Sequence, residues 1–247
     1  MNISISRNEL KEAVAGFTKI VNGKSHALPI LGCVRFESNG RVIIAQATDL
    51  DQTVRYAFTG AQAQGEGAFI VPLSNIKELA KGSDKETIEF ETGDHGSLSI
   101  TNHVGTHAVR HPVAGMDLNE WPACPAETST KPAEGFLETD QRLVPFASTD
   151  NTRYLLNGVY IDVAETGDHP VTMVATDGRR LSLWNTMNLP VPMSAIVPTT
   201  RFLTWKDLQG DAEIGLRTEL VKKETVVKGI AVRTRHPDRA QTQGPSP

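Results

Sequence analysis

The sequence predicts an α+β protein made of two tandem copies of one domain, each with two helices backed by antiparallel sheets. Two observations support this fold class: short segments recur in the same order about half a chain apart, and segments with helical periodicity alternate with segments of strand periodicity. The chain has 247 residues, of which 39% are hydrophobic and 22% charged. That length and composition suit two medium-sized globular domains.

Three segments carry the repeat. Gly32 corresponds to Gly158, each with apolar residues after it, and two triplets also recur: Ala-Thr-Asp at residues 47–49 and 175–177, and Ile-Val-Pro at residues 70–72 and 196–198. A period this long exceeds a solenoid unit and indicates two domains of one fold. A segment rich in Pro and Thr over residues 119–132 is typical of a linker. We therefore place the boundary near residue 130, giving domains 1–129 and 130–247.

The first copy begins with a helix. Ser6 followed by Glu9 is a capping-box signature, and the apolar residues after it recur at helical spacing, which predicts an amphipathic helix over residues 7–21. Pro72 begins a second helix that ends near Gly82. Period-two alternation predicts strands around residues 34–36, 42–44 and 54–58, and again over 86–91, 97–102 and 106–111, with Asn39-Gly40 as a hairpin turn.

The second copy repeats this order. A helix is expected near residues 138–147, kinked or shortened because Pro145 removes a backbone hydrogen bond and clashes with the preceding turn. A fourth helix is expected after Pro198. Strands are expected around residues 156–163, 170–176 and 180–186 and from residue 213 onward, before a polar ending that starts at Arg233.

Composition excludes several classes. The net charge of −4 gives no global basic surface, so binding to nucleic acid requires local clusters of positive charge. Cys33 and Cys124 form no C-x-x-C pair, which excludes a zinc ribbon and a disulfide framework. No stretch approaches the roughly 18 apolar residues of a transmembrane helix, and the N-terminus lacks the apolar core of a signal peptide. We expect a cytoplasmic protein that binds no membrane.

No catalytic set is recognisable, and no metal or cofactor is expected. His103, His107 and His111 would suit a metal on a helix, but the alternating residues between them predict a strand or hairpin. Ligands four apart on a strand are separated by about 13 Å, too far for one zinc ion. Asp49 and Asp51 form a D-x-D pair, yet Asp49 recurs as Asp177, which favours a structural turn. A metal-dependent hydrolase is thus the weakest alternative.

The residues around the repeated segments resemble the bacterial beta sliding clamp family, the beta subunit of DNA polymerase III. The resemblance covers about residues 1–210 and fades afterwards. It implies the DNA-clamp fold and a non-catalytic processivity factor for DNA replication, in which six domains close a ring around duplex DNA with the helices lining the hole. The resemblance rests on residues 27–32, 47–51, 153–158 (Arg-Tyr-Leu-Leu-Asn-Gly) and 174–181 (Val-Ala-Thr-Asp-Gly-Arg-Arg-Leu).

The chain departs from the family pattern in its domain number. Family chains have three such domains and dimerise, whereas two are recognisable here. Either three copies of a two-domain chain form a homo-oligomeric ring, or the chain is truncated. A further alternative is a monomeric clamp-like interaction module that binds clamp-binding peptides without encircling DNA.

The resemblance also implies two sites. It places nonspecific contacts to duplex DNA at Lys24, Arg153 and Tyr154, and Lys77 and Arg201 extend the basic set on the second and fourth expected helices. It places a groove on the second domain that captures short linear peptides from the DNA polymerase III alpha subunit and the clamp loader. The groove positions are Leu156, Thr176, Gly178, Arg179, Arg180 and Leu181. The alternative for residues 176–178 is a turn with a purely structural charge.

Overall fold

The computed structural model describes residues 1–21, 28–93, 97–104, 107–114, 116–123, 128–150, 152–163, 171–205, 208, 210, 212–221 and 224–234. The chain divides into two compact units, Met1–Pro125 and Ala126–Pro247. No helix within the described ranges has the length and apolarity needed to span a membrane. Lys24 and Cys124 lie outside the described residues.

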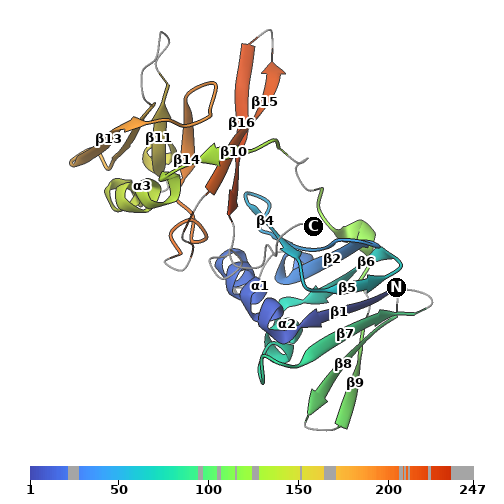
Figure 1. Ribbon diagram of the computed structural model, residues 1–247. Coiled ribbons are helices and arrows are strands. Elements are labelled where there is room, and N and C mark those ends of the chain that lie inside the picture. The colour runs from blue at the N-terminus through green and yellow to red at the C-terminus, as the bar shows by residue number, and fades with distance from the viewer. Residues whose placement is uncertain are drawn as a thin grey trace, which may run out of the picture. The chain divides into compact units, whose positions relative to one another are not determined.

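The first unit holds two antiparallel sheets and two helices (Figure 1). Helix α1 spans Arg7–Ile20 and α2 spans Leu73–Leu79, and short 3-10 helices span Pro29–Gly32 (η1) and Leu118–Glu120 (η3). One sheet has the order β4 (Thr53–Phe58), β3 (Ile43–Thr48), β2 (Cys33–Asn39), β6 (Glu66–Pro72). The other has the order β5 (Gln62–Gln64), β1 (Asn2–Ser6), β7 (Thr87–Thr92), β8 (Leu98–Val104), β9 (His107–Val113).

The predicted first helix is confirmed, and its capping explains where it begins. Ser6 accepts a hydrogen bond from the Glu9 backbone N–H at 3.3 Å, which satisfies one of the donors left free at a helix N-terminus. The Glu9 carboxylate reaches the turn after β4, where Oε1 accepts from the backbone N–H groups of Thr59 and Gly60, both at 3.1 Å. Glu9 thus ties α1 to the sheet beside it.

Aromatic rings join the two sheets of the first unit. Phe36 on β2 stacks on Phe69 of β6 and on Phe90 of β7, with ring centroids 5.1 and 5.3 Å apart. Phe69 and Phe90 also stack on each other at 5.5 Å. Because Phe90 belongs to the other sheet, this cluster is the centre of a core that both sheets share.

The second unit repeats this order, with one α-helix in its described residues (Figure 1). Helix α3 spans Phe136–Leu143, followed by the 3-10 helices η4 (Val144–Phe146) and η5 (Tyr154–Leu156). One sheet has the order β13 (Leu181–Met187), β12 (Val171–Thr176), β11 (Gly158–Asp162), β14 (Ala195–Pro198). The other has the order β10 (Lys131–Ala133), β15 (Ala212–Val221), β16 (Glu224–Thr234).

Pro145 shortens the third helix as predicted. The α-helix ends at Leu143, and the chain tightens into η4 around Pro145. A proline has no N–H to continue the α-helical ladder, whereas a 3-10 turn tolerates it at its start.

The described residues after Pro198 do not form the fourth predicted helix. After β14 the described residues 199–205 form hydrogen-bonded turns. The Thr200 hydroxyl accepts from the Leu203 N–H at 3.1 Å, and the Thr200 carbonyl accepts from the Thr204 N–H at 3.0 Å. Thr200 thus caps a single turn, as Ser6 caps α1. The next backbone bonds are of the i→i+3 type, from the Trp205 N–H to the Phe202 carbonyl at 3.1 Å and from the Leu208 N–H to the Trp205 carbonyl at 3.0 Å, so the described residues do not continue an α-helix. Arg201 is consequently an exposed turn residue.

Two further details of the sequence prediction are corrected. The polar ending does not begin at Arg233, because β16 continues to Thr234 and Arg233 pairs with Glu213. The repeated glycines are also not equivalent. Cys33 lies opposite Pro72 and Gly158 lies opposite Pro198, so Gly158 matches Cys33, one residue beyond Gly32.

Candidate functional site

Four of the predicted groove residues form one tight turn between β12 and β13. Asp177 Oδ1 accepts from the backbone N–H groups of Arg179 and Arg180 at 2.8 and 2.7 Å. The Thr176 hydroxyl accepts from the Gly178 N–H at 3.0 Å and donates to the Arg180 carbonyl at 2.6 Å. Gly178 has a φ of 86°, which a residue with a Cβ rarely adopts. The structural role expected for Asp177 is therefore confirmed.

Asp177 is ionised over the whole physiological range. Hydrogen bonds from the Arg180 and Arg179 backbone lower its pKa to about 2, and the Arg180 side chain contributes further. Arg180 Nε donates to Asp177 Oδ2 at 3.0 Å, and its guanidinium lies 5.7 Å from the centroid of the Phe146 ring. The turn is thereby attached to η4 through the guanidinium of Arg180.

The structure brings Arg153 to this turn. Arg153 lies just before η5, and its Nη1 donates to the Asp177 carbonyl at 3.5 Å, while its Nε lies 3.8 Å from Asp150 Oδ2. A Cβ on Gly178 would lie 3.2 Å from Arg153 Nη1. The residue predicted to contact DNA and the glycine predicted to line the groove are therefore direct neighbours.

Apolar side chains lie on the two elements next to this turn, β13 and η5. Leu181 lies opposite Thr176 in the sheet and is 59% exposed. On η5, Tyr154 is 74% and Leu155 60% exposed, whereas Leu156 is half-buried and its carbonyl accepts from the Ser148 N–H at 2.8 Å. Leu155 was missed by the sequence analysis, although it stands between two predicted residues. Apolar anchors beside arginines suit a short extended peptide.

The remaining DNA candidates lie on separate elements. Lys77 is exposed in the last turn of α2 in the first unit. Arg201 lies in the turn after β14 in the second unit. Both residues are exposed, and exposure is the only requirement that a phosphate contact from solvent sets for a cation.

The histidine cluster is split between the two faces of a hairpin. In the β8–β9 register His103 pairs with Ala108, whereas His107 and His111 pair with Val104 and Ile100. Side chains alternate along a strand, so His103 faces away from the other two. Within the described residues, no group of three or more His, Cys, Asp or Glu is arranged to hold a metal ion.

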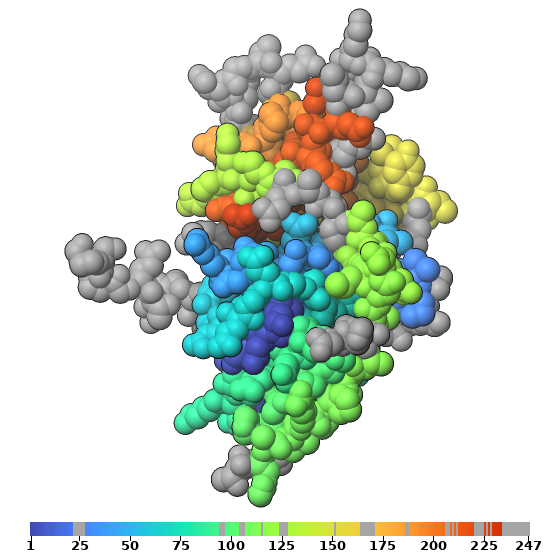
Figure 2. Space-filling model, turned by 90° about the vertical axis from the view of Figure 1, so that its right-hand side faces the viewer, coloured from blue at the N-terminus to red at the C-terminus, as the bar shows by residue number. Residues whose placement is uncertain are grey.

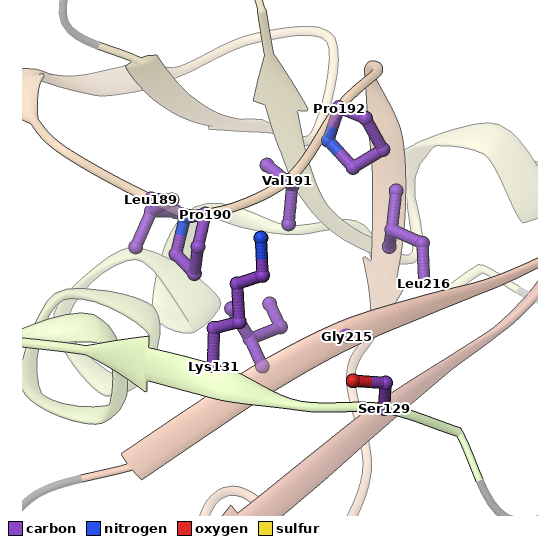
Figure 3. Close-up of a pocket in the computed structure, with 9 residues that line it drawn as sticks. Ser129, Lys131, Leu189, Pro190, Val191, Pro192, Gly215 and Leu216 are labelled. Atoms are coloured by element: carbon purple, nitrogen blue, oxygen red, sulfur yellow. The ribbon is translucent and has the colours of Figure 1, made fainter.

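A separate hollow of about 420 Å³ lies elsewhere in the second unit (Figure 3). Its walls come from the segment before β10, the loop after β13 and the middle of β15, and the Lys131 side chain extends into it. None of the predicted site residues lines it. The lining residues are Ser129, Lys131, Leu189, Pro190, Val191, Pro192, Ile214, Gly215 and Leu216.

Known proteins match both units. The family model for the DNA polymerase III beta subunit, N-terminal domain, matches residues 1–125. The beta sliding clamp of Caulobacter vibrioides is 30% identical over an alignment of 209 residues that covers 79% of this chain and 52% of that protein. The beta sliding clamp of Streptomyces coelicolor is 25% identical over 205 residues, 80% of this chain and 52% of that protein. The chain thus spans about half the length of these relatives.

Solved structures share the fold. The Caulobacter crescentus pol III beta structure has a TM-score of 0.72 at 23% identity and covers 96% of this chain and 67% of that one. The beta subunit from DNA polymerase of Streptococcus pyogenes has a TM-score of 0.72 at 18% identity, covering 96% of this chain and 62% of that one. The expected clamp fold is confirmed by these structures.

Proposed function

This chain belongs to the DNA polymerase III beta subunit family, and from that membership we propose that it acts as a sliding clamp, a non-catalytic subunit that tethers the replicative polymerase to duplex DNA. The observation that carries the proposal is the family match over residues 1–125. We assign Met1–Pro125 to the N-terminal domain and Ala126–Pro247 to the central domain of the clamp. The repeated strand order of the two units supports this assignment.

For DNA we propose nonspecific contacts by Lys24, Lys77, Arg153, Tyr154 and Arg201. A clamp must orient duplex DNA while sliding along it, which favours scattered phosphate contacts over base recognition. The exposure of Lys77, Arg153, Tyr154 and Arg201 supports this role.

For protein partners we propose a groove formed by Leu156, Leu181 and the turn over residues 176–180. It would take short linear peptides from the DNA polymerase III alpha subunit and the clamp loader. Support comes from the exposed Leu181 side chain, the fixed turn beside it and the neighbouring arginines. Such a site gains affinity mainly from a few apolar anchors.

Truncating the groove should weaken peptide binding. We expect Leu156→Ala and Leu181→Ala each to reduce affinity for a polymerase-derived peptide roughly 5- to 150-fold, because a lost anchor costs about 1 to 3 kcal/mol. Fluorescence anisotropy with a labelled peptide measures this. Leu118→Ala is the matched control, since Leu118 is a leucine of the first unit that is 42% exposed. Unchanged affinity in both groove variants would remove the groove from the proposed function.

The alternative function is an interaction module that binds such peptides without encircling DNA. The net charge of −4 favours it, because no global basic surface attracts DNA. Retention on circular DNA, described at the end of the Discussion, separates the two.

A further inference from the structure

An apolar row crosses the outer face of the sheet in the second unit. Leu183 on β13 lies opposite Val174 on β12, which lies opposite Tyr160 on β11, which lies opposite Ile196 on β14. Residues directly opposite one another share a face. Leu183 is 52% and Tyr160 41% exposed, and Val174 and Ile196 are half-buried. We call these four residues the apolar row.

The same row in the first unit is largely polar. There Arg55 on β4 lies opposite Gln46, which lies opposite Arg35, which lies opposite Ile70. The two rows are equivalent because Ile70 and Ile196 each precede a paired proline by two residues, and their partners are Arg35 and Tyr160. One fold therefore presents arginine and glutamine where its second copy presents tyrosine, valine and leucine.

The first unit also shows what kind of segment this face accepts. Residues after β9 return to the sheet, and Met116 and Trp121 pack on the cluster of Ile30, Leu31, Cys33 and Ile70. Cys33 Sγ lies 3.3 Å from Met116 Sδ. Figure 2 shows this light-green segment on the surface of the first unit. A short segment that folds around the 3-10 helix η3, with two apolar anchors and with Asp117 and Glu120 between them, thus covers the Ile70 end of the row.

We propose that the apolar row binds a short acidic and apolar segment of a partner polypeptide, continuing past the peptide groove. This proposal rests on the proposed function, because it extends the same site. Leu181 and Leu183 lie on the same face of β13 about 7 Å apart, so a peptide over Leu181 passes directly onto the row.

The charge beside the row selects an acidic partner. Arg153, Arg179 and Arg180 are exposed at the end of the sheet next to Leu181. Asp177 pairs with Arg180 and Asp150 lies near Arg153, so at the Leu181 end of the row three cations face two carboxylates. Asp162, two residues beyond Tyr160 on the same face of β11, is an exposed carboxylate away from that end, so the acidic part of the partner is expected over Leu181. Carboxylates flanking apolar anchors, as in the segment of the first unit, complement this arrangement.

The test uses a labelled peptide with the sequence of residues 116–122, Met-Asp-Leu-Asn-Glu-Trp-Pro, and the full chain. We expect saturable binding that becomes at least tenfold weaker in the triple variant Tyr160→Gln, Val174→Thr, Leu183→Gln, which changes no charge. The matched control is Leu28→Gln with Val42→Thr, because Leu28 and Val42 are 52% and 43% exposed in the first unit. The control should bind the peptide as the unmodified chain does.

The outcomes distinguish this proposal from the groove. A cooperative thermal melting transition shows whether the triple variant folds. If it does not fold, the single variant Leu183→Gln replaces it, and we expect that variant to bind the peptide about threefold more weakly. The proposal is overturned if the peptide does not bind, or if it binds the row variants as tightly as the unmodified chain. This holds whatever effect Leu181→Ala has on the affinity for the polymerase peptide. Loss in the row variants, with Leu181→Ala leaving the polymerase peptide unaffected, supports the row and contradicts the groove.

Discussion

Replacing Asp140 by leucine is expected to stabilise the second unit by on the order of 4 kcal/mol at pH 8. Asp140 lies on α3 with 1% of its surface exposed. Neither of its carboxylate oxygens has a hydrogen-bond partner in the described structure. Burial raises its pKa from 3.8 to about 7. Above that pH the folded unit must hold an unpaired charge in its interior, which is strongly unfavourable.

Leucine is the residue that the first copy of the fold uses at this place. The buried positions of α1 include Arg7, Glu9, Leu10 and Ala13, and those of α3 include residues 137, 139, 140 and 143. This common spacing makes Asp140 the counterpart of Leu10, which is fully buried in the first core. A leucine side chain at residue 140 therefore suits the site in size and polarity.

The pH dependence has a definite sign. The pKa of Asp140 is higher in the folded than in the unfolded state, so the free energy of unfolding is highest below the unfolded pKa, near 4. This free energy falls as the pH rises, and the fall is complete above the folded pKa of about 7. We expect the melting temperature of the second unit in the unmodified chain to fall between pH 5 and pH 8. In Asp140→Leu this pH dependence should vanish, and the melting temperature at pH 8 should be more than about 10 °C higher than in the unmodified chain.

Asp140→Asn is the control for charge. It removes the titration but keeps a buried polar group, so the pH dependence should disappear with a smaller gain in stability. Destabilisation by Asp140→Leu, or the same pH dependence in both variants as in the unmodified chain, would show that Asp140 is not a buried uncompensated carboxyl.

Reversing two of the proposed DNA contacts should weaken binding to linear duplex at least tenfold at low salt. Lys24→Glu with Arg153→Glu removes two phosphate contacts and introduces repulsion, so the slope of log affinity against log salt should fall by about one unit for each lost contact. Base sequence should have no influence, because a sliding protein must tolerate every base pair.

The control for total charge is Lys81→Glu with Arg110→Glu. Both residues are exposed cations of the first unit, paired with Glu78 and Glu91. An equal loss of affinity in this control would assign the effect to net charge alone, and no loss in the Lys24 and Arg153 variant would remove these two residues from the proposed contacts.

Elements with strong local signals were predictable. The hydrogen bond at Ser6 and the apolar stripe fix α1, and Pro145 ends α3, because both effects act within one or two turns. The expected helix after Pro198 begins with a turn capped by Thr200, but in the described residues i→i+3 bonds of Trp205 and Leu208 replace the α-helical ladder. The strands β5, β10 and β14 have only three or four residues, too few for an alternating pattern to be recognised. In β10, Pro132 also argues against a strand, because proline is rare inside strands.

The candidate site was predictable in part. The turn over residues 176–180 follows from its own residues, since Asp177 and Gly178 are turn formers. The approach of Arg153 to Asp177 joins residues 24 positions apart and depends on tertiary packing. The apolar row was hidden because the glycine repeat is one residue out of register with the strands, which exchanges the two faces of β11.

Retention on closed DNA tests the clamp function most directly. The chain is incubated with nicked circular duplex and with the same duplex after linearisation, the duplex is recovered at moderate salt, and bound protein is measured. The clamp account predicts that circles retain protein and that cutting them releases it, because closure around DNA replaces the weak affinity expected at a net charge of −4. Equal retention on both, or a tight sequence-selective complex on a short linear duplex, would contradict it.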